Sequence, residues 1–359
     1  MLRLATFNVE NMFSRPKVMS GTWAEGKKVL DDVTKLTGLL AKPVYSAADK
    51  NAIRQIMLKY EFGNRQKKDR PFDIRENKGK LFVVPKGTKD VRIEAKGRDS
   101  WAGWVELTKQ DIDFDATVNT GRVIDAIKPD VICTVEVEDR LTLDRFDQLV
   151  LSKFAGAPFS FNMLVDGNDA RGIDVGLYCR KEIRSIRSHV QDGGKDRIFS
   201  RDCPEFEIPF ANGKTLWVLG NHFKSQGFGA PKSNDAKRLR QATRVAEIYA
   251  ECRKRSDFVA VAGDLNVPPG HASIKPLRDT DLKDVMSHPA YQGPAWTFAP
   301  KKEKLDYILL SPALWQKIKA VGLETRGVFA PRTVQAFPEV TSRTNAASDH
   351  AALWVDLDL

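Results

Sequence analysis

The sequence lacks any long uninterrupted apolar stretch, and this absence argues against a membrane-spanning segment. Charged residues interrupt every apolar run well before the roughly 18 residues that a membrane helix requires. The first residues, MLRLATFNVE, also lack the apolar region and the small-residue cleavage site of a signal peptide. We therefore expect a cytoplasmic protein with no stable membrane association.

Cysteine is scarce as well, with four residues in a chain of 359. They are Cys133, Cys179, Cys203 and Cys252, and none of them forms a CxxC pair or lies near a histidine at the spacing of a zinc site. This distribution excludes a disulfide framework of the kind found in small secreted proteins. We expect reduced and mostly buried thiols.

Acidic residues are fewer than basic ones, and the formal net charge of the chain is +10. The excess is concentrated in two segments: residues 14–118 carry 22 Lys and Arg against 15 Asp and Glu, and residues 224–255 carry 9 against 3. Such segments favour a polyanionic partner, because each neutralised phosphate releases counterions. A basic run is also typical of the solvated face of an amphipathic helix, so charge alone leaves both interpretations open.

Short apolar runs rich in Val, Ile, Leu and Phe recur along the chain and predict β-strands. The expected strands are Leu2–Val9, Val131–Val137, Phe159–Val165, Val175–Cys179, Leu216–His222, Phe258–Ala262, Leu305–Leu310 and Ala351–Leu357. Helices are expected at Arg122–Ile127, Leu143–Phe154 and Asp235–Lys254. Many strands with few helices between them favour packed sheets flanked by helices over a doubly wound parallel sheet.

The stretch of residues 13–117 has a different composition, rich in Lys, Gly and Asp with a sparse apolar pattern. We interpret it as a basic insertion, an inserted subdomain or extended loop region within a single domain of residues 1–359. A short helix at Ala47–Tyr60 and a hairpin around Leu81–Ile93 are expected inside it. Its aromatic residues can stack on nucleic-acid bases, but a core for the insertion is the simpler explanation: Phe62, Phe72, Trp101 and Trp104.

Polar side chains end several predicted strands, at places where catalytic groups gather on a rigid scaffold. They are Asn8 and Glu10 in TFNVEN, Glu136 in VICTVEVED, Asn221 and His222 in VLGNHFKS, Asp264 and Asn266 in VAVAGDLN, Asp306 in KLDYILL, and Asp349 and His350 in SDHAAL. A single Asp or Asn after a strand commonly caps a turn. The whole set points instead to one site of carboxylates, amides and imidazoles.

These residue types suit a hard divalent cation and proton transfer. Carboxylate and amide oxygens without thiolates favour Mg²⁺ or Mn²⁺, and magnesium keeps waters that leave room for a substrate phosphate. Imidazoles move protons near neutral pH. Such parts suffice to hydrolyse a phosphodiester by in-line attack of an activated water.

The ordered series TFNVEN, VEVED, RGIDVGLY, NHFKS, GDLN, LDYIL and SDH resembles the endonuclease/exonuclease/phosphatase superfamily, which includes deoxyribonuclease I and exonuclease III. The match covers about residues 2–11 and 119–359. It implies an α/β (α+β) fold, a four-layered α/β sandwich of two face-to-face mixed β-sheets flanked by helices, with a basic insertion after the first strand.

The resemblance also implies roles for the motif residues. Asn8, Glu136 and Asp349 would lie at the metal, with Glu136 as its principal ligand. Asp264 and Asn266 would orient the attacking water and the scissile phosphate.

Two histidines would complete the site. His350 would act as general base or phosphate stabiliser, held in its tautomer by Asp306. His222 would contact the phosphate and protonate the leaving oxygen, backed by Asp174, and Arg171 would bind a phosphate oxygen.

The sequence departs from the family pattern after the predicted strand Leu216–His222. Many relatives have one residue between the Asn and the His of this motif, whereas Asn221 and His222 are adjacent. Adjacent strand residues point to opposite faces, which puts the role of Asn221 in doubt. Asn221 and Lys224 remain candidate phosphate ligands beside Arg171.

We therefore expect a metal-dependent phosphodiester hydrolase with Mg²⁺ or Mn²⁺, a nuclease acting on DNA or RNA. The alternative is a phosphatase or phosphodiesterase acting on a phosphoinositide, sphingomyelin or a small nucleotide. A non-catalytic nucleic-acid-binding module is disfavoured, because no expected ligand or general base is missing. The sequence indicates no protein partner.

Overall fold

The computed structural model describes residues 1–12, 18, 23–67, 69–109, 114–154, 158–169, 171–210, 213–227 and 229–359, and of Asn11 and Trp23 only the backbone. The chain divides into two compact units. We call residues 1–13 and 112–359 the main unit, and residues 14–111 the inserted unit. The predicted insertion, residues 13–117, begins at Phe13, which lies outside the described residues.

The main unit contains two six-stranded sheets, and the first is built around the N-terminal strand. Its strand order is β15-β16-β1-β6-β8-β7, with β1 parallel to β6 and antiparallel to β16. The strands are β1 (Leu2–Met12), β6 (Val131–Val137), β7 (Phe161–Leu164), β8 (Asp174–Cys179), β15 (Ile318–Glu324) and β16 (Ala352–Leu357).

The second sheet is also mixed. Its order is β13-β14-β12-β11-β10-β9, with β11 parallel to β12 and β14 antiparallel to β12. The strands are β9 (Ser185–Arg187), β10 (Glu205–Pro209), β11 (Thr215–His222), β12 (Phe258–Asp264), β13 (Lys283–Asp284) and β14 (Asp306–Leu310).

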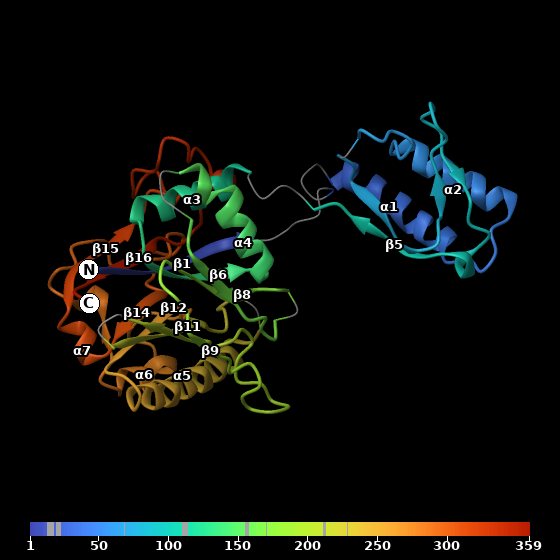
Figure 1. Ribbon diagram of the computed structural model, residues 1–359. Helices are drawn as coiled ribbons and strands as arrows, with labels where there is room; N and C mark the ends of the chain where they lie inside the picture. Colours follow the sequence, from blue (N-terminus) through green and yellow to red (C-terminus); the bar gives the residue numbers. More distant parts are fainter. Residues whose placement is uncertain are drawn as a thin grey trace. The chain divides into compact units, whose positions relative to one another are not determined.

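The two sheets face each other across an apolar core, and helices cover their outer faces (Figure 1). Helices α3 (Asp115–Ile127) and α4 (Arg140–Leu149) pack on the first sheet. Helices α5 (Pro231–Arg253) and α6 (Lys275–Arg278) pack on the second, and α7 (Pro312–Trp315) follows β14. This is the four-layered sandwich that the sequence predicts.

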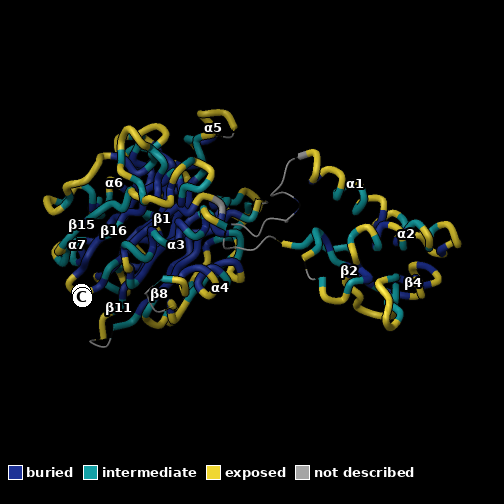
Figure 2. The backbone as a smooth tube through the Cα atoms, turned by 90° about the horizontal axis from the view of Figure 1, so that it is seen from above, coloured by how far each residue is buried: buried dark blue, intermediate teal, exposed yellow. Residues whose placement is uncertain are grey.

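The central strands of both sheets are mostly apolar because both of their faces are buried (Figure 2). In β6, Val131, Cys133 and Val135 face the core between the sheets. Ile132 alternates with them and faces the helices, and Val137 reaches the same face after the register shift between Val135 and Val137. The polar ends of these strands are therefore exceptions that packing between the sheets does not explain.

Each of the eight predicted strands and the three predicted main-unit helices has a counterpart. Strands β9, β10, β13 and β15 were not predicted, because they are short or half-exposed and carry no continuous apolar run. Five 3₁₀ turns complete the named elements: η2 (Arg98–Ser100), η3 (Leu151–Lys153), η4 (Ala272–Ile274), η5 (Val285–Ser287) and η6 (Arg343–Asn345).

The inserted unit has its own hydrophobic core. Its elements are α1 (Trp23–Leu40), α2 (Ala47–Lys59), β2 (Phe72–Lys78), β3 (Phe82–Val83), β4 (Arg92–Ile93) and β5 (Ala102–Leu107). Helix α2 begins with a capping box in which Ser46 and Asp49 satisfy each other's backbone N–H groups. The expected helix and the β3–β4 hairpin are thus present, whereas α1 and the β2–β5 pair were not predicted.

The aromatic residues of the inserted unit divide into two groups. Phe62, Phe72 and Trp101 are buried in its core, and the indole of Trp101 donates to the Tyr45 hydroxyl at 2.9 Å. Trp104 is 55% exposed. The explanation as a core is confirmed for the first three residues and wrong for Trp104.

The expectations about the cysteines and about membrane-spanning helices can be compared with the structure. The four cysteines are buried and unpaired, as expected. In the described part of the chain, no helix combines the length and the apolarity needed to cross a membrane.

Candidate active site

The sheet topology brings the predicted polar residues to one edge of each sheet. The parallel strands β1 and β6 both end there in the first sheet, with Asn8 beside Val135 and Glu136 following. In the second sheet, His222 of β11 pairs with Asp264 of β12, and Asp264 pairs with Asp306 of β14. Carboxyl ends of parallel strands meet at one sheet edge, so residues far apart in sequence become neighbours.

His350 is held by Asp306 in the interior of this edge. The Asp306 carboxylate lies 2.7 Å from Nδ1 of His350, and both residues are buried. Nε2 of His350 lies 4.0 Å from Asp264 and 3.7 Å from Asp349. The Asp306 contact fixes the ring so that Nε2 faces the other carboxylates.

The segment that carries His350 is tied to the first strand. The Ser348 hydroxyl donates to the carbonyl of Asn8 at 2.7 Å and accepts the N–H of His350 at 2.9 Å. The N–H of Asp349 donates to the Glu10 carboxylate at 2.8 Å. These bonds join the His350 loop to β1, and they position the histidine opposite the carboxylates of both sheets.

Asn8 connects the two sheets at the centre of the site. Its amide lies 3.2 Å from the Asp264 carboxylate and 3.4 Å from that of Glu136. Asp264 also accepts the N–H of Asn266 at 2.8 Å. The amide of Asn266 donates to the carbonyl of Phe223, so this side chain braces the loop after β11.

Three of the site residues have strained backbones. Glu10, Glu136 and Asn266 have φ values of 44°, 69° and 56°, in the left-handed region that non-glycine residues rarely adopt. Register shifts in β1 and β6 accompany the first two. Strain of this kind costs on the order of 1–3 kcal/mol per residue and is concentrated at functional sites, where it aims side chains that a regular strand would misdirect.

Gly263 of the GDLN motif is required by close packing. A Cβ at this position would lie 1.9 Å from the carbonyl oxygen of Asn221, and φ is +137°. Only glycine lets β11 and β12 approach closely enough for His222 and Asp264 to lie side by side.

The carboxyl groups of the site have too few positively charged neighbours to balance their negative charge. Burial and the neighbouring Asp306 raise the pKa of Asp264 to about 7. Displacement of water and the nearby Asp349 raise the pKa of Glu10 to about 7, and burial raises those of Glu136 and Asp349. A cation among these oxygens would relieve the repulsion, so the donor set fits a hard divalent metal ion.

Two ligand sets compete for such an ion. Ligand atoms of Asp264, Asp306 and His350 lie within 4.8 Å of one another. However, Asp306 and Nδ1 of His350 already satisfy each other. Glu136, Asp349 and Asn8 offer oxygens not engaged with an imidazole at hydrogen-bond distance, and we favour this set.

His222 occupies the other wall of the site, and its environment is basic. Its Nε2 lies 3.9 Å from Glu136, and its Nδ1 has no hydrogen-bond partner among the described residues. Burial, followed by the charges of Arg201, His350 and Arg171, lowers the pKa of His222 well below its usual value. The ring is therefore neutral at pH 7.

Arg201 is a site residue that the sequence did not reveal. Its side chain is 2% exposed, Nε lies 3.1 Å from Asp169, and an Nη donates to the carbonyl of Phe223. Its charge lowers the pKa values of Glu136, His222 and Lys224. With Arg171, which pairs with Asp169, and Lys224, it forms what we call the basic wall: Arg171, Arg201 and Lys224.

Two predicted site residues are placed elsewhere. Asp174 accepts the N–H of Gly167 at 2.8 Å, and no contact joins it to His222 in the described structure. Asn221 is fully buried and donates to the carbonyl of Leu219, because it alternates with His222 along β11. The structure therefore gives neither residue the predicted position.

The basic residues of α5 are largely engaged in ion pairs. Arg238 pairs with Asp235, Arg240 with Asp196, and Arg244 with Asp192. These contacts hold α5 and the loop before β10 together. They reduce the positive charge that this helix can offer to an external phosphate backbone.

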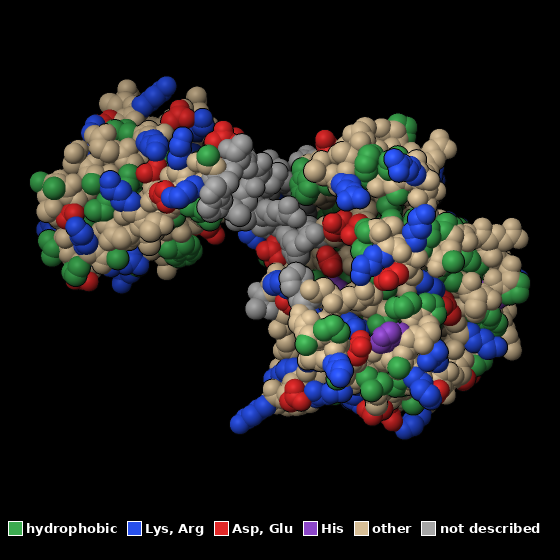
Figure 3. All heavy atoms as spheres, turned by 180° about the vertical axis from the view of Figure 1, so that it is seen from behind, with side chains coloured by type: hydrophobic (Ala, Val, Ile, Leu, Met, Phe, Trp, Pro, Cys, Tyr) green, Lys and Arg blue, Asp and Glu red, His purple; other side chains and the backbone are tan. Residues whose placement is uncertain are grey.

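The space-filling view shows acidic side chains gathered around a hollow on one face of the main unit (Figure 3). Fold and site together define a class: an α/β sandwich that positions a carboxylate–histidine cluster at one end of its two sheets.

The chain belongs to the endonuclease/exonuclease/phosphatase family, whose model matches residues 114–350. Members of this family are in general hydrolases of phosphate esters that use a divalent metal.

Solved structures with similar folds come from bacteria and from human. An endonuclease/exonuclease/phosphatase from Bacteroides vulgatus has 17% identity and a TM-score of 0.50, over 68% of this chain and 90% of that one. A mannosyl-6-phosphatase from Bacteroides thetaiotaomicron has 17% identity and a TM-score of 0.50, over 68% and 91%.

The catalytic domain of human Nocturnin has 14% identity and a TM-score of 0.50, over 67% of this chain and 85% of that one. At these identities the likeness establishes the fold. No curated protein sequence matches the chain.

Proposed function

We propose that the chain is a divalent-metal-dependent phosphodiesterase that hydrolyses nucleic acid. The observation that carries this proposal is the Asp306–His350 pair, whose free Nε2 faces Asp264 and Asp349 at the junction of the two sheets. A carboxylate behind an imidazole fixes its tautomer and favours its charged form. The pair is thus prepared to donate to a phosphate oxygen.

Glu136 and Asp349, with Asn8, would hold the metal. When bound, Mg²⁺ or Mn²⁺ polarises a phosphate oxygen and lowers the pKa of a bound water. The chain supplies the remaining functions through its own side chains. His350 donates from Nε2 to the phosphate, and Asp264, in a closed hydrogen-bonded setting, accepts a proton from the attacking water.

The basic wall supports a phosphate substrate on the opposite side. Arg171 and Arg201 both lie near Lys224, since the charge of each contributes to lowering the pKa of Lys224, and Arg171 also lies near Arg201. They hold positive charge beside His222, which stays neutral. A phosphate between His350 and this wall would be neutralised from both sides.

Nucleic acid is favoured as the substrate by the overall charge of +10. A repeating phosphate backbone gains from each cationic contact, whereas a single phosphoester gains only from those that touch it. Because the ion pairs of α5 engage several cations of that helix, the contacts to the backbone fall mainly to the basic wall.

The test compares wild type with His350→Gln on single- and double-stranded DNA, RNA and bis(p-nitrophenyl) phosphate, with Mg²⁺, Mn²⁺ or EDTA. We expect hydrolysis that requires the metal and falls about a hundredfold or more in the variant, as for the loss of an acid–base group. An Arg278→Gln variant, at an exposed position of α6, serves as the matched control. Intact nucleic acids together with cleavage of an inositol or lipid phosphate would contradict the nuclease proposal.

A further inference from the structure

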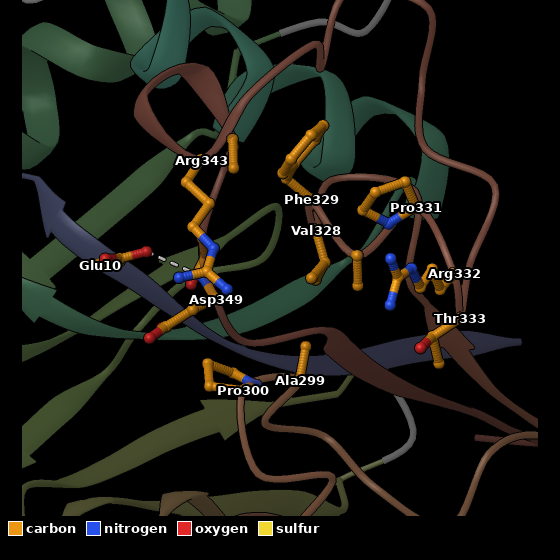
Figure 4. Close-up of a pocket in the computed structure, with 13 residues that line it drawn as sticks. Glu10, Ala299, Pro300, Val328, Phe329, Pro331, Arg332, Thr333, Arg343 and Asp349 are labelled. Carbon is orange, nitrogen blue, oxygen red and sulfur yellow. Dashed lines mark hydrogen bonds between the residues drawn. The ribbon is translucent and has the colours of Figure 1, made fainter.

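A cavity of about 540 Å³ lies directly beside the candidate active site (Figure 4). It shares Glu10, Ser348 and Asp349 with that site. The rest of its wall comes from residues 299–300, 328–333, 343 and 346. None of the predicted roles uses this space, although a substrate bound at His350 would extend past it.

The wall of the cavity is anchored to the fold. Val328 is buried against Trp296 and Ala351, and the N–H of Ala347 donates to the carbonyl of Gly327 at 2.9 Å. The N–H of Thr333 donates to the carbonyl of Ala330 and closes a turn. The cavity is thus part of the folded main unit.

Two arginines line this cavity without partners. Neither Arg332 nor Arg343 makes a hydrogen bond or an ion pair through its side chain with the described residues. Figure 4 shows Arg343 extending toward Asp349 and Arg332 on the opposite side, next to Thr333. In contrast, the nearby Arg326 pairs with Glu324. The two cations of the cavity are therefore available to an anion that the protein does not supply.

The cavity also offers apolar surface. Beside the two arginines it is lined by Ala299, Pro300, Val328, Phe329, Ala330 and Pro331. Such a wall suits the flat face of a base or the carbon face of a furanose. The Ser348 hydroxyl is not available to a ligand, because it is already engaged with Asn8 and His350.

We propose that this cavity binds the neighbouring nucleotide of the substrate between Arg332 and Arg343, whose positive charges attract a second phosphate while the first lies at His350. Guanidinium groups bind phosphate oxygens through charge-assisted and often bidentate hydrogen bonds. The inference rests on the proposed function and adds to it a determinant of specificity: a substrate with two phosphates separated by a nucleoside.

The test measures binding by calorimetry, so that it does not depend on turnover. The probes are thymidine 3′,5′-bisphosphate and thymidine 5′-monophosphate, and the proteins are wild type, Arg332→Gln and Arg343→Gln. We expect wild type to prefer the bisphosphate by at least about tenfold, and each substitution to reduce this preference about tenfold. The exposed Arg278→Gln variant, outside the cavity, should keep the wild-type preference.

A preference that is unchanged in both arginine variants overturns the second-phosphate site. Fructose 1,6-bisphosphate distinguishes a nucleotide from other bisphosphates, and we expect it to bind at least tenfold more weakly than thymidine 3′,5′-bisphosphate. Equal binding of the two overturns the nucleoside part. The failure of the proposed function is recognised separately, as an absence of hydrolysis by wild type in the His350→Gln assay.

Discussion

His350 and His222 lie on opposite walls of the same cleft, and the chain surrounds them with charge of opposite sign. Burial alone would lower the pKa of His350, but Asp306, Asp264 and Asp349 raise it to about 10. His222 is equally enclosed, and Arg201 adds to the burial that lowers its pKa. Two residues of one type are therefore held in different protonation states.

The difference arises from the sheet register. Asp306 begins β14 opposite the end of β12, so its carboxylate reaches the imidazole of His350. No carboxylate reaches His222 at hydrogen-bond distance in the described structure, since Glu136 is 3.9 Å away. The protonated ring can donate to a phosphate, while the neutral ring can orient water or substrate without adding charge. The predictions below test this division.

Replacing Asp306, the carboxylate that pairs with the charged His350, should have the largest effect. In Asp306→Asn the amide keeps the shape but not the charge, so His350 loses its proton at or below about pH 6.5. Because its pKa is raised in the wild type, the imidazolium is present below that raised pKa and lost above it. We expect kcat/KM for bis(p-nitrophenyl) phosphate to fall about a hundredfold at pH 8.

The check is a profile of kcat/KM from pH 5 to 10. The variant should lose activity as the pH rises through 6 to 7, whereas wild type should not lose it there. Asp174→Asn is the matched control, because that carboxylate was predicted to back a histidine and instead accepts the N–H of Gly167. A variant profile that parallels wild type would show that Asp306 does not set the charge of His350.

Substitution of the neutral histidine should have a moderate effect. In His222→Gln the uncharged amide can replace an uncharged imidazole, so we expect a loss of about tenfold, the size of one hydrogen bond. The loss should be independent of pH between 7 and 8, because burial and the charge of Arg201 hold the pKa of His222 well below its usual value. A loss as large as that of His350→Gln, or a wild-type inflection near pH 7 that the variant lacks, would contradict a neutral His222.

The residues that could be predicted from sequence are those whose position follows from a strand end. Asn8, Glu136, Asp264 and His350 each follow or precede an apolar run, and these polar strand ends, together with the family resemblance, were sufficient to group them. The predicted role of Asn221 was in doubt because adjacent strand residues point to opposite faces. In the structure, its side chain points away from the site. The fold was predictable for the same reason, since its strands are buried on both faces.

Other features depend on tertiary packing that leaves no local pattern. Arg201 comes from a turn-rich segment before β10 and reaches the site only because Phe223 and Asp169 hold it. The left-handed backbone conformations of Glu10 and Glu136 accompany register shifts, which residue preferences do not predict. Arg332 lies in a turn and Arg343 begins the short 3₁₀ turn η6, and neither segment has hydrophobic periodicity.

The smallest effect on activity should come from replacing Asp174, the carboxylate that was predicted to back His222 but does not contact it. Burial raises the pKa of Asp174 from 3.8 to about 7, so between these values the folded chain binds a proton that the unfolded chain does not. The free energy of unfolding therefore decreases as pH rises through this window, and the loss is complete above about pH 7. In Asp174→Asn the side-chain carbonyl can still accept the Gly167 N–H without ionising.

For this variant we expect activity close to wild type, and a Tm that exceeds the wild-type value by roughly 3 °C or more at pH 8 but not at pH 4.5. Thermal melts at the two pH values measure this gap. A gap that is the same at both would mean that the folded chain does not raise the pKa of Asp174, and a large loss of activity would restore it as the partner of His222.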